Sequence, residues 1–170
     1  MRETFTAFAG DRIVARGTRG AVARVLAERD ETGVLIFSDE TGRETDLDLS
    51  GGAEAVAARY PDAPRRGRPK LGVVAREVTL LPRHWDWLAT QRGGASAALR
   101  RLVEEASRGD DGRLRRDAAY RFCSAIAGNL PGFEEAMRQL YSGDRIAFRS
   151  AVAAWPSDIR RHALSLAGMR

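Results

Sequence analysis

Residues 65–70, which read RRGRPK, carry the clearest chemical signal in the sequence, with four positive charges in six residues. Glycine has no side chain, so the backbone can approach another molecule closely there, and proline keeps the chain extended. Thin guanidinium planes can enter a narrow groove of strongly negative potential. A solvated basic linker is the alternative interpretation. The segment predicts binding of a polyanion through Arg65, Arg66, Gly67, Arg68, Pro69 and Lys70.

The charge of the chain is unevenly distributed. Residues 1–60 carry a formal net charge of −3, residues 61–109 of +5 and residues 110–170 of +3. A charge concentrated in one region produces a local potential that attracts a partner of opposite sign. Of the 28 basic residues only Lys70 is a lysine, and the planar arginine fork suits both phosphate and guanine. The middle of the chain therefore predicts a nucleic-acid partner.

The first 60 residues predict a small acidic α+β domain. Residues 4–8 (TFTAF) and 12–17 (RIVARG) flank a turn signal at residues 9–11, as in a β-hairpin. Thr18 is a suitable N-cap for a helix through Glu28, and residues 34–39 (VLIFSD) predict a further strand. A fourth strand is predicted with Leu47 and Leu49 on one side, followed by a short helix that ends before Pro61.

The rest of the chain predicts a linker and two further parts, so the fold class is α+β with four segments. Residues 61–73 hold three of the six prolines and are interpreted as a basic linker. Residues 74–109 predict a strand over 74–81, a helix that begins at Pro82, a break at Gly93-Gly94 and a second helix capped by Ser96. Residues 110–170 predict four short helices, separated by glycine or proline, that form a C-terminal helical bundle.

Two parts of the central region resemble known DNA-binding elements. The stretch 66–69 (RGRP) resembles the core of the AT-hook, and residues 74–107 resemble the ribbon-helix-helix family in the order of their parts. The first resemblance implies that Arg66 and Arg68 enter the minor groove of A·T-rich duplex. The second implies a homodimer whose paired strands enter the major groove. A strand-helix-helix that packs within a monomer is the alternative interpretation.

The ribbon-helix-helix resemblance also implies a role for each side chain of the strand. Val78 and Leu80 would face the protein core, and the second helix would grip phosphate near its start. The residues on the DNA side would be Arg76, Glu77 and Thr79, with Ser96 at the helix start. Because one of these is acidic, sequence preference is expected to come more from the shape of A·T tracts than from hydrogen bonds to bases.

The chain has few residues suited to catalysis or metal binding, and we predict that it is not an enzyme and has no metal or cofactor. Adjacent carboxylates such as Glu134 and Glu135 point in different directions on a helix. His84 and His162 are interpreted as lone surface histidines, and the single Cys123 allows neither an intramolecular disulfide nor a zinc site of cysteine and histidine. No apolar run has the length of a signal peptide or a membrane span, which predicts a cytoplasmic, nucleoid-associated protein.

The whole sequence resembles a bacterial family named domain of unknown function 2239. Long stretches carry the resemblance, among them GRPKLGVVAREVTLLPRHWDWL, AYRFCSAIAGNLPGFEEA and WPSDIRRHAL. It implies that residues 113–170 belong to the standard architecture of the family, and it transfers no catalytic residue.

From the residues we predict a homodimeric protein that binds double-stranded DNA with an A·T-rich preference, as a transcriptional regulator or an architectural protein. One alternative is a protein-protein adaptor or antitoxin-like protein whose strand-helix-helix only dimerises. A second is an RNA-binding protein, in which a base would stack on an exposed aromatic side chain beside arginine. A protein partner could also bind through the N-terminal or C-terminal domain.

Overall fold

The computed structural model describes residues 3–29, 31–61 and 76–169 of the chain. The fold is α+β, as the sequence predicted, with a three-stranded antiparallel sheet and seven helices in the described residues. The chain divides into two compact units: residues 1–63 together with residues 112–170, and residues 64–111. We call the first the core unit and the second the inserted unit, because it lies in sequence between the two segments of the first.

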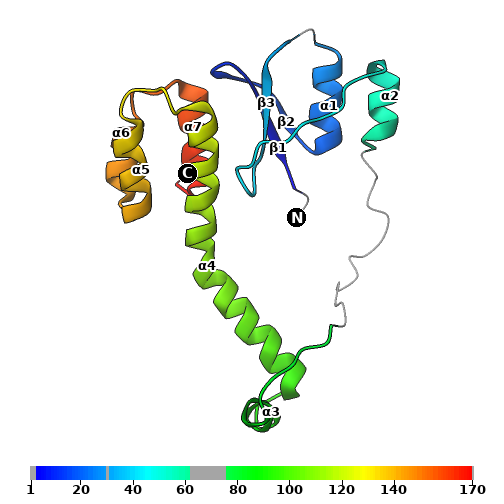
Figure 1. Cartoon of the computed structure of the whole chain (residues 1–170), viewed down its shortest axis with the longest axis vertical. Coiled ribbons are helices and arrows are strands. Elements are labelled where there is room, and N and C mark those ends of the chain that lie inside the picture. Colours follow the sequence, from blue (N-terminus) through cyan, green and yellow to red (C-terminus); the bar gives the residue numbers. More distant parts are fainter. Residues whose placement is uncertain (1–2, 30, 62–75, 170) are drawn as a thin grey trace. The chain divides into compact units, whose positions relative to one another are not determined.

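The sheet of the core unit has the strand order β2-β1-β3 (Figure 1). Strands β1 (Phe5–Ala9) and β2 (Arg12–Gly17) form the predicted hairpin. Its turn contains Gly10 at φ +59°, a conformation that favours glycine. Strand β3 (Val34–Ser38) pairs antiparallel with the other edge of β1.

A β-bulge in the hairpin turns Ile13 and Ala15 of β2 to opposite faces of the sheet, although they are two residues apart. Ala7 pairs with Ala15 but Phe8 pairs with Ile13, so β2 has one more residue than β1 at this point. A shift of one residue reverses the face to which side chains point. Ala15 therefore lies in one hydrophobic cluster with Phe5, whereas Ile13 packs against the larger cluster that contains Phe8. Both faces of the sheet thus contribute to a hydrophobic core.

One face of the sheet is covered by α1 (Arg19–Ala27), which packs in turn against α2 (Gly52–Arg59). As predicted, Thr18 caps α1, and its hydroxyl oxygen accepts a hydrogen bond of 3.2 Å from the Ala21 N–H. Val22 and Leu26 of α1 are buried against the sheet in the smaller cluster. The helix predicted before Pro61 is α2.

The predicted fourth strand around Leu47 and Leu49 is wrong. After β3, the described residues form only an isolated bridge to that strand. The backbone around Asp48 has other partners, because the Tyr60 hydroxyl accepts its N–H at 2.9 Å and Arg59 donates to its carbonyl at 2.7 Å. Side chains from the end of α2 therefore provide the hydrogen bonds that a strand ladder would have provided.

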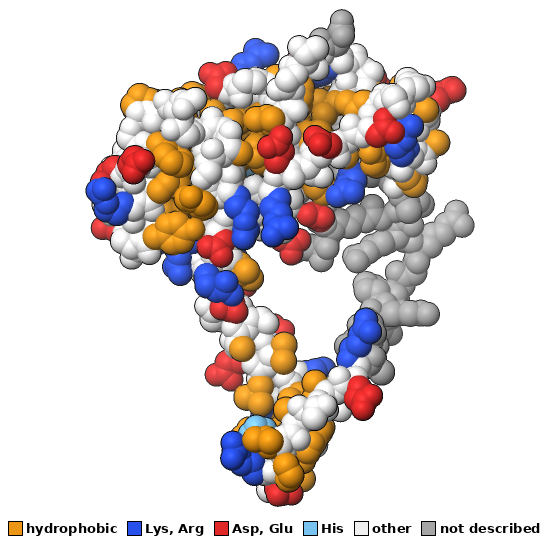
Figure 2. All heavy atoms as spheres, in the orientation of Figure 1, with side chains coloured by type: hydrophobic (Ala, Val, Ile, Leu, Met, Phe, Trp, Pro, Cys, Tyr) orange, Lys and Arg blue, Asp and Glu red, His pale blue; other side chains and the backbone are white. Residues whose placement is uncertain are grey.

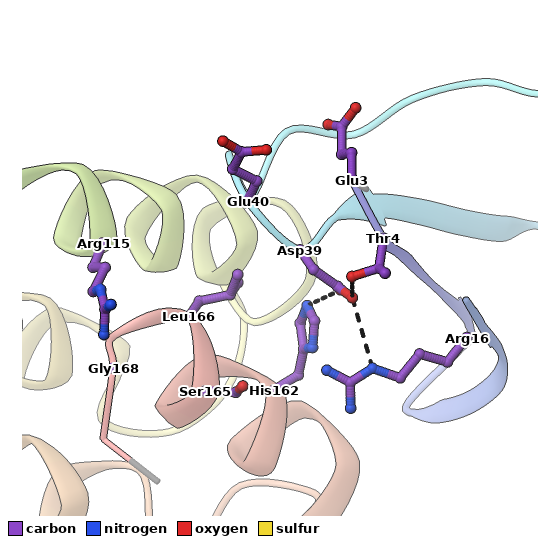
Figure 3. Close-up of a pocket in the computed structure, with 10 residues that line it drawn as sticks. All are labelled: Glu3, Thr4, Arg16, Asp39, Glu40, Arg115, His162, Ser165, Leu166 and Gly168. Carbon is purple, nitrogen blue, oxygen red and sulfur yellow. Dashed lines mark hydrogen bonds and ion pairs between the residues drawn. The ribbon is translucent and has the colours of Figure 1, made fainter. Parts of the chain in front are cut away.

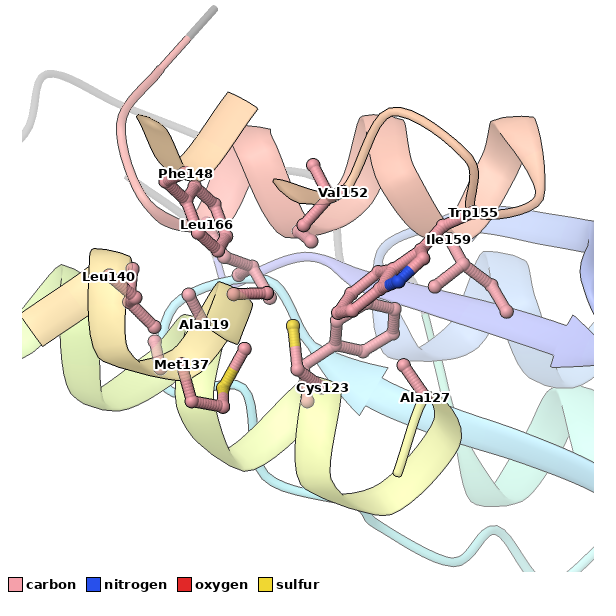
Figure 4. Close-up of a cluster of buried hydrophobic side chains, with 14 of the residues drawn as sticks. Ala119, Cys123, Ala127, Met137, Leu140, Phe148, Val152, Trp155, Ile159 and Leu166 are labelled. Carbon is pink, nitrogen blue, oxygen red and sulfur yellow. The ribbon is translucent and has the colours of Figure 1, made fainter. Parts of the chain in front are cut away.

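The other face of the sheet is covered by α7 (Ser157–Leu166) and the last part of α4 (Gly94–Ile126), with α5 (Phe133–Ser142) and α6 (Arg145–Ala151) packed beyond them (Figure 1). Phe122 of α4 lies 5.4 Å from Phe8 and 5.0 Å from Phe37 between ring centroids. Figure 4 shows the helical side of this core. The indole N–H of Trp155 donates a hydrogen bond of 2.9 Å to the carbonyl oxygen of Pro131. Sheet and helices therefore share one core.

Two features of the predicted organisation differ from the structure. Helix α4 is continuous through Gly109 and Gly112, where the sequence predicted separate helices. Glycine weakens a helix by about 1 kcal/mol relative to alanine but keeps its backbone N–H, and no proline interrupts this stretch. In addition, the parts predicted as separate domains at the two ends of the chain form one unit with a common core. Despite its length, α4 is not apolar enough to span a membrane, and neither is any other helix of the described ranges.

Candidate functional site

The predicted DNA-binding residues fall into two groups. Residues 65–70, which we call the basic arm, lie outside the described residues. Arg76, Glu77 and Thr79 are described and exposed, as is Ser96. The strand predicted over 74–81 is not formed in its described part, because residues 76–81 pair with no strand among the described residues. A segment that pairs with a second copy of itself has no ladder within one chain.

Two helices follow in the inserted unit, namely α3 (Pro82–Ala89) and the first turns of α4. Pro82 occupies the first turn of α3, as predicted, where its missing N–H removes no hydrogen bond. Gly93 at φ +86° and Gly94 at φ +74° turn the chain, and α4 begins at the second of them. The prediction that Ser96 caps this helix is therefore wrong, because the glycine conformation starts the helix two residues earlier and Ser96 lies in its first turn.

The inserted unit leaves much of its apolar surface uncovered. It has a hollow of about 250 Å³ that is lined by Leu80, His84, Trp87, Leu88, Leu99 and Leu102. Trp87 is 50 % exposed, and Val78 and Val103 are 53 % and 62 % exposed. Hydrophobic side chains are visible at the surface of this part of the chain in Figure 2. We use the name apolar face for the exposed large apolar side chains of this unit taken together, which are Val78, Leu81, Trp85, Trp87, Leu102 and Val103. Val78, predicted to face a core, is exposed and packs into no core formed by the described residues.

The charges of the inserted unit outside the basic arm are balanced. Residues 76–111 contain six arginines and six acidic residues. They therefore carry no formal net charge at pH 7. Of the net charge of +5 on residues 61–109, from which a polyanion partner was predicted, the basic arm supplies +4, Asp62 −1 and residues 76–109 +2. The described part of the unit is distinguished by its apolar face.

A second candidate site, in the core unit, centres on His162, and the prediction that this residue lies at the surface is wrong. The imidazole is 1 % exposed and lies 5.5 Å from Phe8 and 4.6 Å from Phe122 between ring centroids. Neither ring nitrogen has a hydrogen-bond partner among the described residues. Oδ1 of Asp39 lies 3.8 Å from Nε2, which is beyond hydrogen-bond distance. Burial lowers the pKa of His162 to about 4, although Asp39 acts in the opposite direction, so the imidazole is neutral at pH 7.

Asp39 is held beside His162 by hydrogen bonds and an ion pair. The hydroxyl groups of Thr4 and Thr6 each donate a hydrogen bond of 2.6 Å to its carboxylate. The Nε atom of Arg16 lies 3.7 Å from Oδ2. Figure 3 shows His162 of α7 and Arg16 of β2 directed toward this carboxylate, in a hollow of about 750 Å³. The arrangement places a fixed anion next to a neutral imidazole.

His162 also lines a second hollow of about 780 Å³, which we call the arginine hollow. Its other polar lining residues are Arg16, Arg149, Ser157, Arg160, Arg161 and Ser165. Among the described residues that line it there is no carboxylate. Ile13, Leu164 and Met169 supply its apolar wall.

Two of these arginines are fixed without losing their charge. Arg149 donates to the carbonyl oxygen of Met169 at 3.0 Å, and Arg160 donates to that of Ala153 at 2.5 Å. Both acceptors are neutral, and each engages one nitrogen of a guanidinium group that has five N–H donors. The other two arginines each lie beside one aspartate. The hollow therefore combines excess positive charge with positioned donors.

The arrangement around His162 provides binding groups more readily than a catalytic dyad. Ser165, His162 and Asp39 line the same hollow, but no hydrogen bond joins either neighbour to the imidazole, as nucleophilic catalysis by such a set requires. Burial raises the pKa of Cys123 to about 12, which keeps the thiol protonated. The described ranges contain no group of three or more His, Cys, Asp or Glu side chains that could hold a metal ion.

Helical spacing is the sequence signal that could have placed His162 inside. Ile159, His162, Ala163 and Leu166 recur at positions i, i+3, i+4 and i+7 of α7, and all four are buried. The preceding arginines occupy other faces of the helix, which is why charge next to a histidine did not indicate its exposure. The approach of Asp39 to His162 has no such local signal, because these residues lie far apart in sequence.

Comparison with known proteins identifies a family for nearly the whole chain. A family model described as an uncharacterized protein conserved in bacteria (DUF2239) matches residues 4–167. No curated protein and no solved structure matches the sequence. The matched range includes both segments of the core unit and the whole inserted unit, so both units belong to the architecture of the family.

Proposed function

The chain belongs to this bacterial family, whose description states no activity, and we propose from its own residues that it is a homodimeric DNA-binding protein with a regulatory or architectural role. The observation that carries the proposal is the apolar face of the inserted unit, which follows the basic arm directly in sequence. The basic arm then attracts a polyanion, and the inserted unit that follows it pairs two copies of the chain. Both features are expected of a protein that binds double-stranded DNA.

The apolar face supports pairing with a second copy of the chain. Residues 76–111 are too few to enclose a full hydrophobic core alone, and large side chains such as Trp87 and Val103 stay exposed. Two copies related by a twofold axis would cover these side chains mutually. Residues 76–81 would pair antiparallel with their own copy, which satisfies backbone groups that have no strand partner among the described residues. Arg76 and Thr79 would then lie on the ribbon that docks on DNA.

The basic arm supplies the attraction in this proposal. Residues 76–111 carry no net charge, so binding to phosphate depends on the four charges of residues 65–70. Arg66 and Arg68 enter the minor groove of an A·T tract, while the ribbon occupies the neighbouring groove and Ser96 approaches phosphate. Sequence preference then follows the shape of the groove more than hydrogen bonds to bases.

Dimerisation is tested by a charge placed in the apolar face. We expect the parent chain to sediment as a dimer at tens of micromolar, a concentration at which obligate dimers persist, and Val78→Glu to sediment as a monomer. Ile146→Glu is the matched control, because Ile146 is an exposed apolar residue on α6 of the core unit. A monomeric parent, or equal dissociation of both variants, would remove the ribbon from the proposal.

DNA binding is tested by Arg66→Lys with Arg68→Lys, which keeps the net charge and changes only the shape of the cation. Lysine is more strongly hydrated and costs more to desolvate in a narrow groove. We expect fluorescence anisotropy to show a loss of about 1–3 kcal/mol on A·T-rich duplex and little loss on G·C-rich duplex. Equal affinities of variant and parent on both duplexes would identify the arm as a polycationic linker.

The same measurement at two salt concentrations separates the alternatives. Deleting residues 65–70 removes four positive charges, so the slope of log affinity against log salt should flatten by roughly 3 to 4. A parent that dimerises but binds no duplex would favour a protein-protein adaptor. Displacement of the duplex by single-stranded RNA at lower concentration than by unlabelled DNA would favour RNA as the ligand.

A further inference from the structure

We propose that the arginine hollow of the core unit binds a small molecule that carries a phosphate group. Four guanidinium groups line it, and no carboxylate does so among the described lining residues. Arg149 and Arg160 are oriented by backbone carbonyl oxygens, which hold them in place and leave their charge uncompensated. Planar guanidinium groups with several N–H donors match the oxygens of a phosphate group. The hollow thus presents a preformed set of donors to an anion.

His162 adds a buried recognition group to this hollow. Its side chain is 1 % exposed, and neither of its nitrogens has a hydrogen-bond partner among the described residues. Buried polar groups without partners are rare in folded proteins and are costly to leave unsatisfied. A neutral imidazole has one N–H donor and one acceptor nitrogen. A ligand in the hollow could satisfy one of them, which gives a reason for a histidine at this position of α7.

The size and the wall of the hollow favour a small organic molecule over a bare ion. Its volume of about 780 Å³ lies within the range of roughly 300–1,000 Å³ that is typical of small-molecule sites. Ile13, Leu164 and Met169 line the part that the arginines do not. An anionic head and an apolar or ring-containing body would therefore both find matching surfaces.

Pyrophosphate serves as the probe, and the two histidines of the chain report where it binds. His162 lines the arginine hollow, whereas His84 lines the apolar hollow of the inserted unit and is the internal control. Titration of the ¹⁵N-labelled full chain at constant ionic strength should shift the imidazole resonances of His162 and leave those of His84 in place. Absence of a shift at His162 at millimolar pyrophosphate, or equal shifts at both residues, would overturn the proposal.

Two closely matched arginines separate a site from a general effect of charge. Arg161 and Arg138 are each 70 % exposed, and each pairs with an acidic residue three positions earlier in its helix. Only Arg161 lines the hollow. We expect Arg161→Gln to weaken pyrophosphate binding at least about tenfold by calorimetry, and Arg138→Gln to change it by less than about twofold. Equal losses would overturn the proposal. If Arg161→Gln unfolds in a thermal melt, Arg160→Gln takes its place.

A phosphate in the hollow could also come from nucleic acid, and two further arms of the experiment distinguish the sources. A chain that lacks residues 65–70 should retain its affinity for pyrophosphate, because the described residues that line the hollow all belong to the core unit. Excess duplex DNA should not displace pyrophosphate from the parent chain. Displacement would assign the hollow to DNA and overturn the small-molecule proposal. The outcome does not depend on the proposed dimer or on the arm.

Discussion

His162 sits in the core unit as a neutral residue, and its surroundings explain why. Burial beside Phe8 and Phe122 is the main reason that its pKa falls to about 4, and Arg16 acts in the same direction while Asp39 opposes it. The ordinary value is about 6.5. Between these two pH values the unfolded chain binds a proton on this residue that the native chain does not, so acid favours unfolding.

The expected consequence is a loss of stability between pH 6.5 and pH 4. The free energy of unfolding should fall by up to about 1.4 kcal/mol per pH unit, about 3 kcal/mol across the window, and should not depend on this residue above pH 7. Urea unfolding of His162→Gln should lack this slope, whereas His84→Gln, at an exposed position, should retain it.

The carboxylate of Asp158 loses its contribution to stability at lower pH. The hydrogen bond from the Ile13 N–H, aided by Arg161, holds the pKa of Asp158 below its usual value of 3.8. The contribution of Asp158 to stability is therefore lost at pH values below the range assigned to His162. If the free energy of unfolding of His162→Gln still falls between pH 6.5 and 4, the loss comes from another group.

At the scale of elements, the turn after β3 is fitted closely to α4. Gly42 has φ +65°, and a Cβ atom built there would lie 2.6 Å from the carbonyl carbon of Ala118. Beside it, Arg121 donates to the carbonyl oxygen of Thr41 at 3.0 Å. The atoms facing Gly42 belong to a helix backbone, which cannot move aside as a flexible side chain could. The turn and the helix can therefore approach only with glycine at this position.

Gly42→Ala should consequently destabilise the core unit by about 3–5 kcal/mol, since it combines a strained φ with a backbone collision. Gly33→Ala is the matched control, because Gly33 has φ +69° but open space around the position of a Cβ atom. We expect it to cost only about 1–2 kcal/mol. Midpoints of urea unfolding measure the difference, and similar losses in the two variants would show that the turn can move away from α4.

The elements that could be predicted from sequence are those with local signals. The cap at Thr18, the turn at Gly10 and the start of α3 at Pro82 depend on residues that are neighbours in the chain, and the structure confirms all three. The predicted fourth strand failed because the backbone of Asp48 is satisfied by side chains from the end of α2. For the candidate sites, the local signals at Pro82 and Gly93-Gly94 indicated the two helices of the inserted unit, but its exposed apolar side chains were not predicted. The hollows around His162 depend on packing between distant segments.

At the scale of the whole molecule, the two ends of the chain complete one core across an insertion. Phe8 and Phe37 are buried against side chains of α4 through α7. Residues 1–63, expressed alone, would expose that face of the sheet, so we expect them to be unfolded by circular dichroism. Co-expressed with residues 64–170, they should co-purify as a folded complex. Phe8→Asp in the short fragment should abolish the association.

Independent folding of the short fragment, or its failure to associate, would contradict a shared core. Val25→Asp offers a comparison within the same fragment, because Val25 lies at the edge of the smaller cluster, on the side of the sheet that α1 covers. It should weaken the association less than Phe8→Asp does.

The discontinuous core unit also has a consequence for synthesis on the ribosome. All three strands emerge within the first 38 residues, but the helical residues that cover Phe8 and Phe37 begin at Ala118, roughly 80 residues later. At about 5–20 residues per second, these intervening residues take roughly 4–16 s to synthesise, and the nascent sheet waits at least that long with one apolar face open. The inserted unit, whose contacts are local, is translated during this interval. Until α7 leaves the exit tunnel and covers this face, the growing chain therefore exposes an apolar sheet surface to chaperones that bind exposed apolar strands.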